Sequence, residues 1–174
     1  MVEPRSPLAH RAADLSRIDA AEVPFLTQVD VRCDAHRAER LGFPSRPNTA
    51  TADEERAVLW LAPDEWLVVS IDTVDEIERW LAAALTDTHH AIVDVSANRA
   101  VLELRGPDRR QLLASGCSLD LEREGGWVPG VCAQTLFARA QVILQELPAA
   151  TRLFVRPSFG DYVVDRLLAA SSAS

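Results

Sequence analysis

The sequence contains no lysine, and all 18 of its basic residues are arginine. Without lysine the chain can form no lysine Schiff base and can carry no Walker-type phosphate loop, because both need that amine. The 26 acidic residues outnumber the arginines and give a net charge of −8. Nucleic-acid binding needs a cationic surface, so this balance argues against a nucleic-acid partner.

Long apolar segments and closely spaced cysteines are also missing. No apolar run approaches the roughly 20 residues that cross a bilayer, and the N-terminal segment MVEPRSPLAHRAADL lacks the apolar core of a signal peptide. Cys33, Cys117 and Cys132 are odd in number and far apart, which is typical of reduced thiols. We therefore expect a cytoplasmic protein with no membrane contact.

No pattern for a metal, a dinucleotide or a nucleophile stands out. His89 and His90 are adjacent, and adjacent side chains on an extended chain point to opposite faces, so a shared ion is not expected. Cys117 and Cys132 have no second pair of ligands for zinc. The segment 125–130, GGWVPG, is not a dinucleotide fingerprint, and we expect it in a loop. We therefore assign no catalytic, cofactor-binding or metal-binding residue.

Apolar periodicity and turn residues predict the order of the elements. Helices are expected after a cap at Asp34, after Asp72 or Thr73, from Pro107 to a cap at Gly116, and after Ser158. Strands are expected over 24–33, 57–61, 66–71, 92–95, 101–104, 133–139, 142–147 and 152–156. The strand at 92–95 is expected to be mostly buried.

A weak internal repeat suggests how these elements combine. The apolar groups at 66–68 and 80–82, with Ile77, recur 87 positions later at 153–155 and 167–169, with Val164. Each copy reads strand–turn–strand–helix. Two copies sharing a sheet give an α+β fold, with helices packed on a mixed or antiparallel sheet. A chain of this length is most simply one domain over residues 1–174, although any two strand–helix units match at a few apolar positions.

Trp127 is the aromatic residue whose role the pattern leaves open. The chain has four tryptophans and one tyrosine, and Trp127 lies in the longest irregular stretch, among glycines, prolines and acids. Such a tryptophan either fills the protein's own core or anchors a partner. As candidates for an interface we name Trp127, Pro129 and Arg139.

Six segments carry a resemblance to a known family. They are SPLAH at 6–10, LAPDEWLVV at 61–69, VDVS at 93–96, LRGPDRRQLLASGCSLDL at 104–121, PGVCAQTLFARAQVIL at 129–144 and VRPSFGDYVVDRLL at 155–168. In this order they resemble the gamma subunit of heterotetrameric sarcosine oxidase. The region 23–51 fits the family least clearly, and its role is left open.

The resemblance implies a role in oxidative demethylation of sarcosine to glycine with oxygen and tetrahydrofolate. It implies alpha, beta and delta subunits as partners. FAD, FMN and NAD are expected on alpha and beta and zinc on delta, with no cofactor on this chain. The implied fold is similar to the folate-binding domain of aminomethyltransferases, the glycine-cleavage T-protein group.

Two alternatives remain at this point. The chain is a folate-binding or aminomethyltransferase-like protein that acts alone, or it is a free-standing regulatory homodimer. Asp94 and Glu103 are the acids nearest to a folate-gripping role in the sequence, and both are more simply explained as strand or turn residues.

Overall fold

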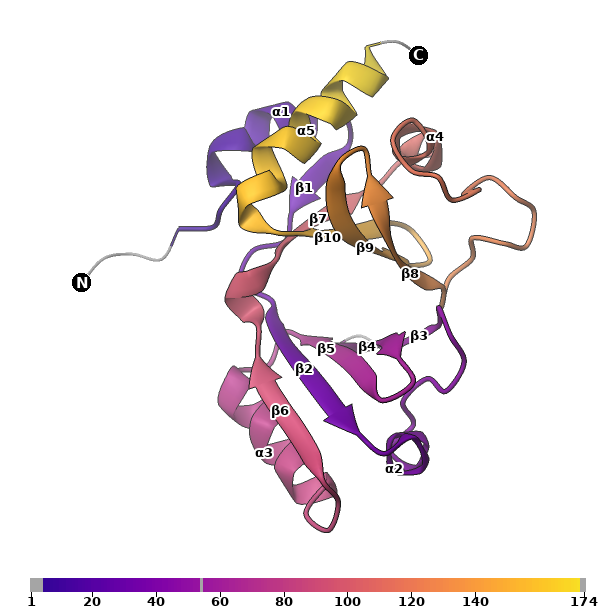
Figure 1. Ribbon diagram of the computed structural model, residues 1–174. Coiled ribbons are helices and arrows are strands. Elements are labelled where there is room, and N and C mark those ends of the chain that lie inside the picture. The colour runs from indigo at the N-terminus through magenta and orange to yellow at the C-terminus, as the bar shows by residue number, and fades with distance from the viewer. Residues whose placement is uncertain (1–4, 54, 173–174) are drawn as a thin grey trace. The chain divides into compact units, whose positions relative to one another are not determined.

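The computed structural model describes residues 5–53 and 55–172 and contains two five-stranded sheets (Figure 1). The chain divides into two compact units. The first comprises Met1–Pro24, Asn98–Pro129 and Gln134–Ser174, and the second comprises Phe25–Ala97 and Gly130–Ala133. That the two units fold as one domain over residues 1–174 stays a prediction.

The sheet of the second unit has the strand order β3–β4–β5–β2–β6. Its strands are β2 (Thr27–Cys33), β3 (Ala50–Ala52), β4 (Arg56–Ala62), β5 (Glu65–Ser70) and β6 (His90–Asp94). Helix α2 (Ala35–Arg40) follows β2, and α3 (Val74–Ala84) follows β5. Because α3 packs against β2 and β6, one face of this sheet is covered by a helix of the same unit.

Local sequence sets where both helices of this unit begin, as predicted. The Asp34 carboxylate accepts hydrogen bonds from the backbone N–H groups of His36 and Arg37 at the start of α2. Thr73 and Glu76 form a capping box at the start of α3, which satisfies two backbone donors reciprocally. Of the two cap candidates in the sequence, Asp72 and Thr73, the structure therefore uses Thr73.

Alternation along β2 builds the core of the second unit. Val29 and Val31 are fully buried and Cys33 nearly so, and all three lie on the face of the sheet that meets α3. From α3, the spacing of three and four residues brings Ile77, Leu81 and Leu85 into the same cluster. The hydrophobic core of this unit therefore lies between α3 and the sheet.

The sheet of the first unit has the strand order β1–β7–β10–β9–β8. Its strands are β1 (Ala20–Glu22), β7 (Ala100–Leu104), β8 (Cys132–Phe137), β9 (Ala140–Glu146) and β10 (Thr151–Val155). Its helices are η1 (Ala9–Arg11), α1 (Ala12–Ser16), α4 (Arg109–Ala114) and α5 (Pro157–Ser171). Helix α5 contacts both α1 and α4 (Figure 1).

The two sheets share one topology. Each contains a hairpin, β4–β5 or β9–β10, that is followed along the chain by a long helix, α3 or α5. Next to the hairpin lies a strand, β2 or β7, that is followed by a short helix, α2 or α4. The outermost place beside that strand is taken by β6 in one sheet and by the N-terminal strand β1 in the other. The predicted strand–turn–strand–helix repeats and the α+β class are therefore confirmed.

The repeats differ from the expectation in one respect, because each has its own sheet. All strand pairs with a described register are antiparallel, and no strand of the first sheet pairs with the second among the described residues. The sequence showed two similar units, but apolar positions alone do not reveal which strands exchange hydrogen bonds.

Two of the predicted strands are placed differently. The strand expected over 24–33 begins at Thr27, since Phe25 has a φ of 60° and is 68% exposed. The strand expected at 92–95 was predicted to be mostly buried, but β6 is an edge strand in which Val93 is 50% exposed. A short apolar run does not reveal whether a second neighbour covers it, and that explains the error.

The starts of two helices also differ from the expectation. Helix α5 begins at Pro157 with Arg156 as its cap, so Ser158 lies inside the helix. Proline suits this first position because the missing N–H has no partner there. Helix α4 begins at Arg109, two residues after Pro107. Within residues 5–53 and 55–172, no helix has the length and apolar character needed to cross a membrane.

Candidate functional site

A buried carboxylate, Glu146, is the centre of a polar cluster in the first unit. Its side chain is fully buried and accepts hydrogen bonds from four other side chains. Oε1 accepts from Nη2 of Arg109 at 2.9 Å and from Nη2 of Arg110 at 2.7 Å. Oε2 accepts from the Trp127 indole Nε1 at 2.8 Å and from the Thr151 hydroxyl.

The fold brings these groups together from four segments. Glu146 ends β9, and Thr151 lies directly opposite at the start of β10 in the antiparallel register. Arg109 and Arg110 are the first two residues of α4 and lie 37 and 36 positions before Glu146. Trp127 comes from the irregular segment between α4 and β8. The cluster therefore links the hairpin, the helix and the loop of one unit.

The loop between α4 and β8 depends on this cluster for its position. Within the segment 118–131 only Leu121 and Trp127 are buried. Trp127 is 4% exposed, while its neighbour Val128 is 41% exposed. A loop of this length without helices or strands is uncommon, and it needs buried anchors to hold one conformation. Trp127 supplies both apolar burial and a hydrogen bond.

The three residues named for an interface therefore have different positions. Trp127 takes the core place that the sequence had left as one of two options, because its indole is bonded to Glu146. Pro129 and Arg139 are exposed, the first in the loop and the second in the turn between β8 and β9. That these residues form an interface with a partner stays a prediction.

The start of the loop is fixed by a close approach to β8. A Cβ atom on Gly116 would lie 2.7 Å from the ring of Phe137, so only glycine fits. The carbonyl of Gly116 also accepts a hydrogen bond from the N–H of Ala138 at 2.6 Å. Gly116 was expected as a helix cap, but Ser115 caps α4 and Gly116 serves this contact instead.

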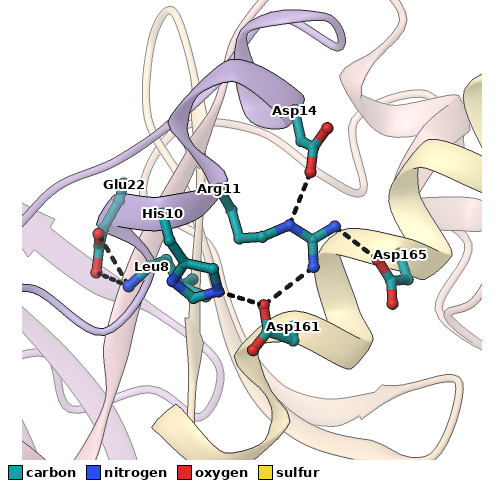
Figure 2. A network of polar contacts seen from close by, with 7 residues as sticks. All are labelled: Leu8, His10, Arg11, Asp14, Glu22, Asp161 and Asp165. Atoms are coloured by element: carbon teal, nitrogen blue, oxygen red, sulfur yellow. Dashed lines mark hydrogen bonds and ion pairs between the residues drawn. The ribbon is translucent and has the colours of Figure 1, made fainter.

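A second polar cluster joins the N-terminal segment to α5 (Figure 2). The Arg11 guanidinium donates to Asp14 at 2.8 Å, to Asp161 at 3.0 Å and to Asp165 at 2.6 Å. His10 Nε2 lies 2.9 Å from the same Asp161 oxygen. These acids hold the pKa of Arg11 above its usual value. Arg11 is thereby linked to two residues of α5 that lie 150 and 154 positions later in the sequence.

The same N-terminal segment is anchored at its other end by Glu22. The Glu22 carboxylate accepts a hydrogen bond from the hydroxyl of Ser6 at 2.6 Å. It also accepts one from the backbone N–H of Leu8 at 3.2 Å (Figure 2). Glu22 belongs to β1, and Leu8 is almost fully buried. The segment therefore closes back on the strand that it precedes.

We expect Asp161→Asn to lower the melting temperature slightly at neutral pH and to have no effect in acid. Hydrogen bonds from Arg11 and then His10 hold the pKa of Asp161 below its usual value. A lowered pKa stabilises the fold above the unfolded value of about 3.9 and loses this contribution as the pH falls through the folded value. The difference from wild type should therefore shrink below about pH 4.

The measurement is a series of melting temperatures from pH 7 downwards for both proteins. Asp161 is 60% exposed, so the effect should also fall with added salt. Asp87→Asn, at an exposed position, is the matched control. A difference that persists unchanged in acid would show that the ion pair does not stabilise the fold.

The two acids considered for folate are engaged by groups of their own units. Asp94 accepts from the backbone N–H and the hydroxyl of Ser96 in the turn after β6. Glu103 accepts from Arg105 at 2.8 Å and from Arg152 at 3.1 Å. Burial acts to raise the pKa of Glu103, but the hydrogen bonds from the two arginines outweigh it and the pKa is lowered. Glu103 is therefore an ionised partner of arginine and not a proton donor at neutral pH.

The buried thiols are not set up for nucleophilic chemistry. Burial raises the pKa of Cys132 to about 11, and the thiol donates to the carbonyl of Thr49. Burial, followed by the charges of Asp34 and Asp64, raises the pKa of Cys33. The nucleophilic form is the thiolate, so both thiols stay protonated at neutral pH. Among the residues that the structure describes, no group of three metal-ligating side chains occurs.

The sequence did not single out Glu146 as the centre of a cluster. A weak signal was available, since Gln145 and Glu146 directly follow the apolar run 142–144, and the structure buries all five residues. Buried carboxylates are almost always paired, but the spacing in the sequence does not identify the partner.

Residues 17–173 match the model of the sarcosine oxidase gamma subunit family. The chain belongs to this family. It is 33% identical to the sarcosine oxidase gamma subunit of Corynebacterium sp. (strain P-1), over 97% of this chain and 90% of that protein. The gamma subunit from an Arthrobacter species is 34% identical over 76% of this chain and 72% of that protein. The resemblance seen in the six segments is thus confirmed.

Solved structures agree with the family and extend the fold comparison. A chain of the heterotetrameric sarcosine oxidase from Corynebacterium sp. U-96, in complex with pyrrole 2-carboxylate, superposes with a TM-score of 0.87 and 30% identity. The match covers 98% of this chain and 95% of that one. Aminomethyltransferase T of Bartonella henselae gives a TM-score of 0.63 at 10% identity, over 90% of this chain and 48% of that one. The latter similarity concerns the fold and confirms the aminomethyltransferase-like architecture.

Proposed function

We propose that this chain is a structural subunit that assembles with the alpha, beta and delta subunits of a heterotetrameric sarcosine oxidase. The match over nearly the whole chain to a component of such an enzyme carries the proposal. In this assembly the oxidative demethylation of sarcosine takes place on other subunits. FAD, FMN, NAD, tetrahydrofolate and zinc are held there, and the complex is cytoplasmic.

The ion pairs and the burial of the ionisable groups favour a structural role over a catalytic one. Glu146, Glu103 and Asp161 each form ion pairs inside the first unit. Cys33 and Cys132 are buried and protonated at neutral pH. Such groups stabilise the fold and are not available for proton transfer or nucleophilic attack, which need accessible groups with suitable pKa values.

We expect the chain to copurify with the other three subunits when all four are produced together. Purified alone, it should show no flavin absorbance and no sarcosine oxidation. The measurement is size-exclusion chromatography with absorbance spectra of each peak. Recovery of this chain only as a separate species, or a stoichiometric flavin band on the isolated chain, would contradict the proposal. Saturable binding of tetrahydrofolate by the isolated chain would favour the folate-binding alternative.

The same experiment addresses the surface that meets the partner subunits. We propose that Pro129 and Arg139 belong to it, because both are exposed and Arg139 has no ion pair within the described residues. Arg139→Glu should therefore weaken assembly without changing the melting temperature of the isolated chain. Arg123→Glu, which reverses an exposed charge in the loop, is the matched control.

A further inference from the structure

The first unit contains a cavity of about 450 Å³ that no role described above uses. A volume of this order is typical of sites for small ligands. Its lining combines polar and apolar side chains. The residues that line it are Arg99, Ser118, Gln134, Thr135, Leu136, Gln141, Val142, Ile143, Phe154 and Arg156.

Strand register explains why two arginines meet at this cavity. Val155 of β10 pairs with Ala100 of β7 and with Val142 of β9. One residue further along, the same antiparallel register places Arg156 between Arg99 and Gln141. Side chains alternate between faces along a strand, and Glu146 of β9 points to α4. Gln141, five positions earlier, therefore lies on the opposite face.

Charge on this face is distributed unevenly. Farther along the same face, Glu103 neutralises both Arg105 and Arg152. At the cavity the lining residues, all within the described part of the chain, include two arginines and no carboxylate. The Arg156 side chain is exposed and makes no ion pair with any described residue. Arg156 therefore brings a positive charge to the cavity in a protein whose net charge is −8.

The floor of the cavity is apolar. Ile143 and Phe154 face one another across β9 and β10 and are 4% and 0% exposed. At the rim, Leu136 of β8 is 50% exposed. Guanidinium groups bind carboxylates through paired, charge-assisted hydrogen bonds, and the amide of Gln141 adds a neutral donor. An apolar floor next to such donors selects an anion that also carries carbon.

We propose that this cavity binds a small organic anion, with its carboxylate between Arg99 and Arg156 and a short apolar body over Ile143 and Phe154. Arg156 supplies a charge that forms no ion pair with any residue of 5–53 or 55–172. The register holds Arg156 near Arg99, because Arg156 directly follows β10, Arg99 directly precedes β7, and these two strands are paired. The arginines thus bind the carboxylate of the ligand, and Ile143 and Phe154 contact its apolar part.

The test uses the full chain and benzoate as the probe. We expect saturable binding in the roughly millimolar range by ligand-observed NMR or calorimetry, since a probe this small gains only a few kcal/mol. Benzyl alcohol, which lacks the charge, and inorganic phosphate, which lacks the apolar body, should each bind at least about tenfold more weakly. Failure of benzoate to saturate, or equal binding of benzyl alcohol, overturns the proposal.

Variants locate the site. Arg156→Gln should weaken benzoate binding at least about tenfold, whereas Arg166→Gln, an exposed arginine on α5 outside the lining, should leave it unchanged. Gln141→Glu adds a carboxylate to the cavity without removing an arginine and should abolish binding even if Arg156→Gln lowers stability. Equal effects of the variants at 156 and 166 would place the anion elsewhere. Binding by the isolated chain that is lost in the assembled complex would show that a partner's carboxylate fills the cavity, which overturns the small-ligand proposal.

Discussion

Replacing Glu146 with alanine is expected to lower the free energy of unfolding by about 3–5 kcal/mol, because it leaves two partly buried arginines without their counter-charge. Arg109 and Arg110 have side chains that are only 15% and 33% exposed, and both donate to this carboxylate. The Trp127 indole and the Thr151 hydroxyl lose their acceptor as well. For a chain of this size the change corresponds to a fall of roughly 6–20 °C in the melting temperature.

Chemical denaturation of the purified chain measures this loss directly. Glu39→Gln is the matched control, since Glu39 is exposed on α2 and should change stability by less than about 0.5 kcal/mol. Glu146→Gln separates charge from shape, because the amide fills the same space but offers one acceptor in place of two. If Glu146→Ala were as stable as the control, the cluster would contribute nothing to folding.

Trp127→Ala is expected to cost about 3–5 kcal/mol of stability, as a buried tryptophan does when it is truncated in a core. The side chain is 4% exposed and anchors a loop that has little other burial. Trp127→Phe keeps most of the ring but removes the N–H, so Glu146 loses one donor and we expect a cost of about 1 kcal/mol. Melting curves of the two variants and wild type provide the comparison.

The outcome also decides between the two roles that the sequence offered for Trp127. A large drop in melting temperature with normal assembly would assign the residue to the core. Weaker assembly with an unchanged melting temperature would make it an anchor for the partner subunits instead. Val128→Ser, at the exposed neighbour, is the control for changes to the loop itself.

Periodicity and turn chemistry were sufficient to predict most elements of the fold. The strands expected over 57–61 and 66–71 and the helix caps at Asp34 and Thr73 all have local causes, and the structure agrees with them. The repeat was visible because both copies place apolar residues at the same spacing. Resemblance to the family came from six such segments rather than from any motif of catalytic residues.

Pairing between distant segments is what the sequence could not reveal. Strand β1 has only three residues, two of them alanine, and it is a strand because β7 offers an edge about 80 residues later. Exposure of β6 depends on the absence of another strand beside it and not on its own composition. Glu146 likewise reads as a polar end of a strand until the fold brings the arginines of α4 to it.

The N-terminal origin of β1 has a consequence for the order in which the protein folds during synthesis. The second unit consists almost entirely of the continuous segment Phe25–Ala97, so it can complete most of its contacts early on the ribosome. The segment that leaves the ribosome first must instead wait for β7 and then for Asp161 and Asp165 of α5. Contacts of such long sequence separation form slowly. A nascent chain stalled before α5 should therefore contain a folded second unit, while its N-terminal segment still lacks the ion pairs with Asp161 and Asp165.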